Sequence, residues 1–210
     1  MPAPYKNPGE AISLYNRVES IPGFFNYDDA QHFWLLLKMQ EAIGIEGDLL
    51  EIGTWKGRSS AFMSYFVKGD QRIFLVDVFS APAKDKYPEY PSIDEVRGNL
   101  FKVNSSVLPN SLVFISGNSS QLQLPKDLRL RFCHVDGGHS FDECYTDLTK
   151  ITPHIISNGI VVIDDYDHPS WTEVKPAVHR WLEDQDGNFN ILGEMNRNPA
   201  KGKKLYAIKA

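Results

Sequence analysis

Residues 47–60, Gly-Asp-Leu-Leu-Glu-Ile-Gly-Thr-Trp-Lys-Gly-Arg-Ser-Ser, are the stretch that decides the fold. Residues 48–52 are too few for a helix and are followed at once by glycine, which predicts a short buried strand and a turn. Gly53 and Gly57 would let the backbone come close to a ligand, and a helix beginning near Ser59 would present N–H groups to it. The segment therefore predicts a strand–turn–helix unit that binds a ligand at the turn.

The spacing of these glycines separates two classes of cofactor. A dinucleotide fingerprint requires G-x-G-x-x-G, so that pyrophosphate can lie on the helix end. Here Glu51, Gly53 and Gly57 form E-x-G-x-x-x-G. The carboxylate of Glu51 suits ribose hydroxyls or a cationic group and repels phosphate. The pattern resembles motif I of the class I S-adenosylmethionine-dependent methyltransferases, whose loop holds the amino-acid end of the cofactor.

Composition excludes several other classes of protein. The chain has 210 residues, enough for one well-buried domain, and a formal net charge of -5, which provides no basic surface for nucleic acid or anionic membrane. No apolar run approaches the roughly 20 residues that span a bilayer, and the N-terminus lacks the apolar core of a signal peptide. Cys133 and Cys144 are expected to be reduced core thiols. We expect a cytoplasmic protein without nucleic-acid or membrane partners, and a homo-oligomer stays open.

Strands and helices alternate along the chain. After residues 48–52, we expect strands at 71–79, 111–116, 130–136, 159–163, 189–192 and 204–208, and helices at 26–44, 59–67, 93–103, 142–151 and about 174–182. This order predicts a single-domain, doubly wound α/β fold of the Rossmann-like type, with a mostly parallel seven-stranded sheet and one antiparallel strand in a hairpin at the edge.

The domain organisation follows from the same pattern. Residues 1–25 are rich in Pro, Gly and Asn and are expected to form an irregular arm before a domain at 26–210. Residues 80–110 form a proline-rich, polar and aromatic insertion, which is typical of a lid or substrate loop and equally of a solvated surface excursion.

Polar residues follow the second and third expected strands. Asp77 lies about 20 positions beyond the glycine turn, where an acidic residue would bind a ribose diol, or would merely cap the next loop. Asn118 and Ser119 follow the strand at 111–116, and they suit a pocket for an adenine ring, although ordinary turns use the same residues.

Carboxylates follow the next two strands. Asp136 ends the strand at 130–136, and Asp164 and Asp165 end the adjacent strand. Like charges held close together are unfavourable unless a proton or a cation is bound. Three carboxylates without thiolates indicate a hard divalent ion, Mg²⁺ before Mn²⁺ or Ca²⁺. The alternative is that Asp164 and Asp165 cap the following loop.

Three blocks make the resemblance more specific. His-Val-Asp-Gly-Gly-His-Ser-Phe at 134–141, Asp-Leu at 147–148 and Gly-Ile-Val-Val-Ile-Asp-Asp-Tyr at 159–166 resemble the macrocin O-methyltransferase and cephalosporin-hydroxylase-type branch of class I methyltransferases, over about residues 21–183. The resemblance implies that Mg²⁺ bound by Asp136, Asp164 and Asp165 orients a sugar or diol hydroxyl. It also implies a lining for S-adenosylmethionine made of Glu51, Gly53, Gly57, Ser59, Asp77, Asn118, Ser119 and Asp136.

These observations predict a Mg²⁺-dependent O-methyltransferase acting on a small hydroxylated molecule, such as a sugar or diol of a secondary metabolite. The base that removes the hydroxyl proton would be His139, then Asp136, then His168. A nicotinamide-dependent oxidoreductase is the first alternative, and the missing third glycine and Glu51 argue against it. A non-catalytic protein that binds the cofactor is the second, and the retained metal-binding aspartates argue against it.

Overall fold

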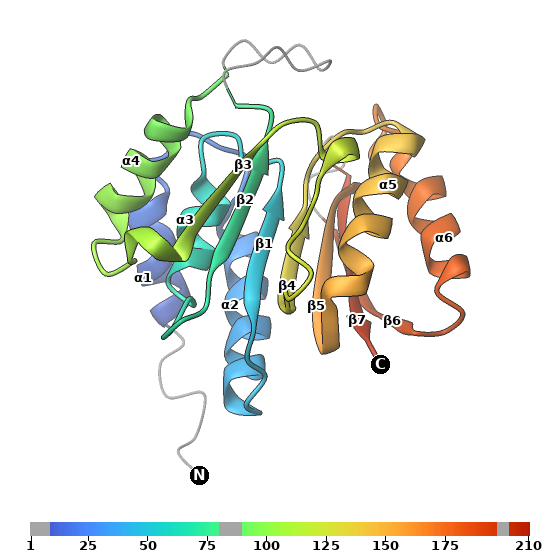
Figure 1. Cartoon of the computed structure of the whole chain (residues 1–210), viewed down its shortest axis with the longest axis horizontal. Helices are drawn as coiled ribbons and strands as arrows, with labels where there is room; N and C mark the ends of the chain where they lie inside the picture. Colours follow the sequence, from blue (N-terminus) through green and yellow to red (C-terminus); the bar gives the residue numbers. More distant parts are fainter. Residues whose placement is uncertain (1–8, 80–89, 197–201) are drawn as a thin grey trace.

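The computed structural model describes residues 9–79, 90–196 and 202–210, and its centre is a seven-stranded sheet (Figure 1). The strand order is β3-β2-β1-β4-β5-β7-β6. Six strands run parallel, and β7 is antiparallel to both of its neighbours in the terminal hairpin. The predicted doubly wound α/β fold with one antiparallel strand at a hairpin edge is confirmed. The strands are β1 (Asp48–Ile52), β2 (Ile73–Asp77), β3 (Leu112–Ser116), β4 (Leu130–Val135), β5 (Ile155–Tyr166), β6 (Phe189–Asn196) and β7 (Lys203–Lys209).

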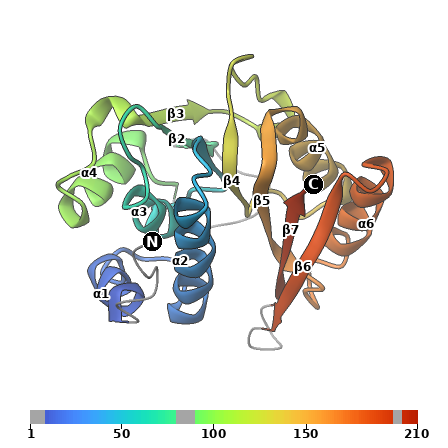
Figure 2. The ribbon, with the colours of Figure 1, turned by 90° about the horizontal axis from the view of Figure 1, so that it is seen from below.

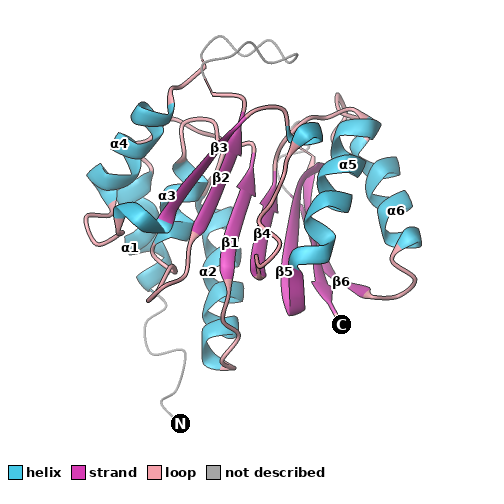
Figure 3. Cartoon of the chain, viewed as in Figure 1, coloured by secondary structure: helices cyan, strands magenta, loops and turns pink. Residues whose placement is uncertain are grey.

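Helices cover both faces of this sheet, as Figures 2 and 3 show. One face carries α1 (Gly9–Val18), α2 (Tyr27–Ala42), α3 (Arg58–Ser64) and α4 (Ile93–Val103), and the other carries α5 (Phe141–Ile151) and α6 (Val174–Asp184). Caps set where the helices begin. Asn26 accepts the backbone N–H of Asp29, whose carboxylate accepts that of Asn26 in return. No helix in the described part of the chain is long and apolar enough to cross a bilayer.

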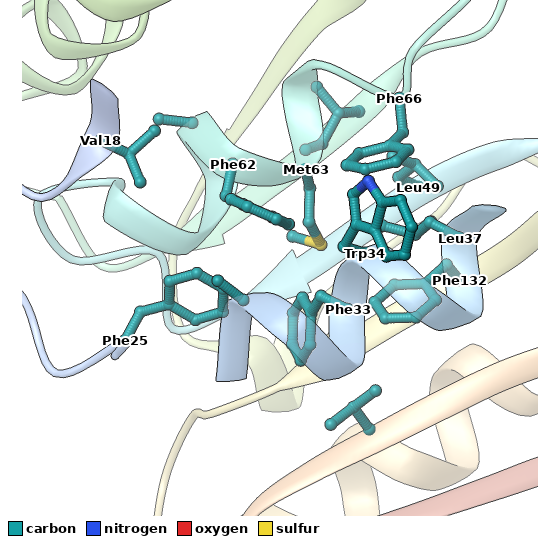
Figure 4. Close-up of a cluster of buried hydrophobic side chains, with 14 of the residues drawn as sticks. Val18, Phe25, Phe33, Trp34, Leu37, Leu49, Phe62, Met63, Phe66 and Phe132 are labelled. Atoms are coloured by element: carbon teal, nitrogen blue, oxygen red, sulfur yellow. The ribbon is translucent and has the colours of Figure 1, made fainter. Parts of the chain in front are cut away.

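Two hydrophobic layers hold the helices on the sheet. In the layer under α2 and α3, Phe33 and Phe62 pack in one cluster with Leu49 of β1 and Phe132 of β4 (Figure 4). The opposite layer packs α5 and α6 on the other face of the same strands. Burying one such aromatic side chain stabilises the fold by roughly 1.5–3 kcal/mol. Both cysteines are buried and free, as expected.

The N-terminal segment differs from the prediction. Residues 9–18 form α1, so the expectation of an irregular arm is wrong for this part of the chain. Ala11, Leu14, Tyr15 and Val18 recur at helical spacing and form an apolar stripe that packs on the core under α2 and α3. The glycine and prolines nearby concealed this stripe.

The expected substrate loop at 80–110 is described only in part. Residues 80–89 lie outside the described residues, whereas α4 has the predicted bounds, with Ser92 as its N-cap. Strand β5 is longer than predicted, because it begins at Ile155 and continues through Asp164 and Asp165 to Tyr166. The two aspartates are therefore part of the strand end and are not in a separate loop.

Candidate active site

A cavity of about 670 Å³ opens at the carboxyl ends of β1 to β5, where open α/β sheets bind ligands. The structure brings nearly all of the predicted site residues to its wall. Those that line it are Gly53, Gly57, Ser59, Asp77, Asn118, Ser119, Asp136, His139, Asp164, Asp165 and His168.

The glycine turn after β1 is required by close packing within the chain. Gly53 has φ +86°, and a Cβ atom there would lie 1.7 Å from the carbonyl oxygen of Asp136. Gly57 has φ +84°, and its Cβ would lie 2.9 Å from side-chain atoms of Val96 and Leu100 on α4. Both positions therefore exclude larger residues, and the turn places the end of β1 directly against the end of β4.

Asp77, at the end of β2, supports the same turn. Its carboxylate accepts the backbone N–H of Trp55 at 2.6 Å and that of Val78 at 2.7 Å. Burial raises its pKa, and the backbone hydrogen bonds act in the opposite direction. Asp77 thus caps local backbone, as the alternative interpretation of the sequence expected, and it also lines the cavity.

A second buried carboxylate lies behind the loop after β4. Asp147 on α5 is fully buried, and its Oδ2 atom would be 2.8 Å from a Cβ at Gly137. Burial raises the pKa of Asp147 to about 7. Asp147 does not line the cavity, whereas Gly137 does.

Glu51 is the exception among the predicted cofactor-binding residues. Its side chain is fully buried and does not line the cavity, and its direct contact with the cofactor stays a prediction. It accepts a hydrogen bond from the hydroxyl of Ser60, and its Oε1 atom lies 2.7 Å from Nδ1 of His134. The physical reason is the alternation of β1, which turns Glu51 toward the face that carries α2 and α3.

The acidic residues gather at the ends of β4 and β5. Asp136 belongs to two groups whose ligand atoms lie within 4.8 Å of one another: one with His139 and Asp165, the other with His134 and Asp164. Burial raises the pKa of Asp136 to about 7, and the nearby carboxylates of Asp164 and Asp165 act in the same direction. Consecutive side chains of a regular strand point to opposite faces, but Asp165 has φ +52°, and both aspartates line the cavity.

His139 is held in a defined orientation beside these carboxylates. Its Nε2 atom lies 2.9 Å from Oδ2 of Asp165, and its ring stacks on Trp171 with centroids 4.2 Å apart and an interplanar angle of 13°. His168 also lines the cavity, but its Nδ1 atom accepts the backbone N–H of Ser170 at 3.0 Å. The geometry thus favours His139 over His168 as the residue that exchanges a proton with a ligand.

A row of buried charged groups crosses four adjacent strands below the acidic cluster. It consists of Glu51, His134, Asp164 and Lys204, on β1, β4, β5 and β7. The Nε2 atom of His134 lies 3.5 Å from Asp164 Oδ2 and 3.2 Å from Lys204 Nζ. Burial and the charge of Lys204 lower the pKa of His134, but hydrogen bonds with Asp164 and Glu51 outweigh them and raise it to about 9.

Aromatic rings form another wall of the cavity. Phe24 stacks on Trp55 with centroids 5.5 Å apart and an interplanar angle of 20°. Arg58 holds this wall: its guanidinium donates to the backbone carbonyl groups of Phe25 and Glu19, each at 3.1 Å, and to that of Ile21. The segment before α2 is thereby attached to the first residue of α3.

Sequence reasoning missed four of these residues: His134, Lys204, Arg58 and Trp171. A charged or polar residue within an otherwise apolar strand was a usable signal for His134 and Lys204. No comparable signal identified Arg58, whose partners are backbone carbonyl groups, or Trp171, whose contact depends on how the loop after β5 folds.

Comparison with known proteins identifies the family. The family model of a methyltransferase domain matches residues 50–166, more than half of the 210 residues. The chain belongs to this family. As a class I S-adenosylmethionine-dependent methyltransferase, it uses the cofactor that its glycine turn predicted, and the nicotinamide-dependent alternative is set aside.

Individual relatives agree with this methyltransferase assignment. Mycinamicin III 3''-O-methyltransferase of Micromonospora griseorubida is 28% identical over 177 residues, which cover 73% of this chain and 67% of the relative. This relative supports the resemblance of the chain to the macrocin O-methyltransferase branch.

Solved structures share the fold of this methyltransferase. The O-methyltransferase NovP superposes with a TM-score of 0.70 at 19% identity, covering 90% of this chain and 83% of NovP. CalS11, a TDP-rhamnose 3'-O-methyltransferase of calicheamicin biosynthesis, gives a TM-score of 0.63 at 16% identity, covering 100% of this chain and 95% of CalS11. At 19% and 16% sequence identity, the similarity to these two structures shows a shared fold alone.

Proposed function

We propose that this methyltransferase transfers the methyl group of S-adenosylmethionine to a hydroxyl oxygen of a small molecule, a sugar or diol of a secondary metabolite, and that it requires a divalent cation, Mg²⁺ first. One observation carries the proposal: Asp136, His139 and Asp165 form a compact group in the same cavity that the glycine turn, Asp77 and Asn118 line. The names of the relatives support O-methylation of small molecules.

The residues at the ends of β4 and β5 fit a divalent cation. Carboxylate oxygens are the ligands that such ions prefer. Burial raises the pKa of Asp136, and the neighbouring charges of Asp164 and Asp165 raise it further. When bound, the cation would lower the pKa of a coordinated hydroxyl, and S-adenosylmethionine would supply the methyl group. Mn²⁺ and Ca²⁺ have the same ligand preference, so the identity of the ion is part of the test.

His139 is the residue proposed to take the proton of the acceptor hydroxyl. With a proton on Nε2, hydrogen-bonded to the carboxylate of Asp165, Nδ1 is the ring atom that can accept another. Asp165 then stabilises the imidazolium that forms, and the stacked ring of Trp171 restricts the orientation of the imidazole. Asp136 is the second candidate for the base.

One side of the cavity is proposed to bind the cofactor, and the other the methyl acceptor. Asp77, Gly53, Gly57, Ser59, Asn118 and Ser119 line the side where the cofactor would bind. The aromatic wall of Phe24 and Trp55 supplies apolar surface against which the acceptor can lie. The insertion at 80–110 is proposed to complete this side as a substrate loop.

The first experiment is calorimetric titration of the protein with S-adenosylhomocysteine, with Mg²⁺ and again after EDTA. Saturable binding in both conditions, together with methylation of members of a sugar and diol panel only when the metal is present, is the expected result. Asp165→Ala and His139→Ala should abolish methylation and leave binding of S-adenosylhomocysteine within about threefold, since neither is proposed to hold the cofactor.

Three outcomes contradict parts of the proposal. A folded protein that binds no S-adenosylhomocysteine contradicts the cofactor-binding residues. Full activity in EDTA contradicts the cation. Tight cofactor binding without turnover of any hydroxyl compound in a broad panel favours the non-catalytic alternative.

A further inference from the structure

Two consecutive glycines in the loop after β4 pack on the acidic face of α5. A Cβ atom at Gly137 would lie 2.8 Å from Oδ2 of Asp147. A Cβ at Gly138 would lie 2.6 Å from Oε2 and 2.7 Å from Cβ of Glu143. Glu143 and Asp147 are four residues apart and therefore share one face of the helix. A side chain at position 138 would displace Glu143, so the glycine there leaves space for this carboxylate.

The two carboxylates of α5 differ in their access to the cavity. Asp147 is fully buried and does not line the cavity, whereas Glu143 lines it together with Gly138. Helix α5 also packs against the short 3-10 helix η2 (Ser119–Gln121), which follows β3. Because Ser119 lines the same cavity, α5 contacts both of the loops, after β3 and after β4, that contribute to this side of the wall.

A structural role accounts for part of the contacts of Glu143. The hydroxyl of Ser140, the N-cap of α5, donates to Oε2 of Glu143 at 2.6 Å and accepts the backbone N–H of Glu143 at 3.4 Å. A carboxylate has about four lone-pair sites, so it can accept further hydrogen bonds beside that of Ser140. Glu143 can therefore support the start of the helix and bind a ligand in the cavity at the same time.

The chemistry of the cofactor indicates which ligand group this would be. An ionised carboxylate only accepts hydrogen bonds, and S-adenosylmethionine has donors in three places: the α-ammonium, the ribose hydroxyls and the exocyclic amine of adenine. The ammonium and the ribose hydroxyls are expected at the glycine turn after β1 and at Asp77 after β2. The amine is the donor that remains for a carboxylate beside the loops after β3 and β4, which line the cavity with Ser119, Gly138 and Glu143.

We propose that Glu143 accepts a hydrogen bond from the exocyclic amine of the cofactor's adenine and thereby selects adenine over a 6-oxo purine. The inference rests on the cofactor-binding side proposed above and adds a specificity-determining residue to it. A 6-oxo purine has a carbonyl oxygen where adenine has the amine. It would therefore place two acceptors against each other at Glu143.

Calorimetric titration with two ligands tests this selection. S-adenosylhomocysteine carries the amine, and S-inosylhomocysteine carries a carbonyl oxygen in its place. The wild type should bind S-inosylhomocysteine at least about tenfold more weakly than S-adenosylhomocysteine. Glu143→Gln, whose amide is both a donor and an acceptor, should bring the two affinities within about threefold of each other. Glu143→Ala should weaken binding of S-adenosylhomocysteine at least about tenfold and should not weaken that of S-inosylhomocysteine.

Two control variants separate recognition of the base from support of the helix. Asp142→Ala removes the neighbouring carboxylate, which is exposed and does not line the cavity, and it should leave both affinities within about twofold. Ser140→Ala removes the hydroxyl that caps α5 and should lower thermal stability, while the ratio of the two affinities stays within about threefold of the wild-type ratio. Circular dichroism shows whether each protein is folded. If Glu143→Ala does not fold, the affinity ratio of Glu143→Gln carries the test.

The results that overturn the inference differ from those that overturn the proposed function. Equal affinities of the wild type for the two ligands, or an equal loss of both in Glu143→Ala, overturn the inference. A folded wild type that binds neither ligand overturns the cofactor-binding side and the inference with it. Selective binding of S-adenosylhomocysteine without methylation of any acceptor overturns the proposed function and leaves the role of Glu143 intact.

Discussion

Replacement of Gly53 by alanine tests the packing of the glycine turn against the end of β4. At φ +86° an alanine is strained by roughly 1–2 kcal/mol, and its Cβ would lie 1.7 Å from the carbonyl oxygen of Asp136. Relief of this clash requires the Asp136 backbone to move by more than about 1 Å, which adds roughly 1–3 kcal/mol of strain. We therefore expect Gly53→Ala to lower the free energy of unfolding by roughly 2–5 kcal/mol in urea denaturation.

The same movement of the Asp136 backbone should also lower the rate of methyl transfer. A misplacement of about 1 Å in a positioned group is able to reduce turnover by about 100-fold, so methyl transfer should fall by at least that factor in protein that remains folded. Gly187→Ala is the matched control, because Gly187 has φ +80° and a Cβ there meets nothing within 4 Å. It should show the backbone strain alone, with activity unchanged. Equal unfolding free energies for the two variants, with activity preserved in Gly53→Ala, would refute the reasoning.

Three other substitutions test separate features. Trp171→Ala removes the ring that stacks on His139 and should lower kcat by about tenfold with little change in KM for the cofactor; a change confined to KM contradicts a role in orienting the imidazole. Asp147→Asn should stabilise the fold at pH 8 by roughly 4 kcal/mol, because the pKa of Asp147 is near 7 in the folded state and the carboxylate is therefore disfavoured there. The stability of the wild type should accordingly fall as pH rises from about 4 to 7, and parallel pH-dependent denaturation curves for the two proteins would contradict this. Phe24→Ala should raise the KM for the acceptor and leave affinity for S-adenosylhomocysteine unchanged, as measured by steady-state kinetics and calorimetry; an equal loss of both would place Phe24 beside the cofactor.

The sheet could be predicted from the sequence because each strand is a short apolar run that ends in turn or acidic residues. The positions of Asp77, Asp136 and Asp165 on one rim follow from that prediction, since the carboxyl ends of parallel strands meet at one edge. The helix α1 does not follow from the sequence in the same way, because the glycine and prolines around it indicate irregular backbone, whereas the apolar stripe from Ala11 to Val18 indicates a helix.

The contacts of Glu51 and Lys204 required knowledge that a single sequence does not contain. A strand-end glutamate faces either the cavity or the core, and the choice depends on the register of β1 against β4. The pairing of Lys204 with Asp164 requires β7 to lie beside β5, yet the two residues are separated by 40 positions in the chain. Both contacts depend on strand register and strand order, and the hydrophobic pattern along a single strand determines neither of them.

The attachment made by Arg58 has a consequence for how the enzyme can change. Its guanidinium binds carbonyl groups of the main chain at Glu19, Ile21 and Phe25, which every amino acid possesses. An exposed side chain of this segment can therefore be exchanged without loosening these hydrogen bonds, whereas Ile21 and Phe25 are buried in the core. Phe24, which is exposed at the cavity wall, is a position where libraries of variants could alter acceptor preference while the scaffold beneath stays anchored. The hold of Arg58 on the main chain thus does not depend on which side chain stands at position 24.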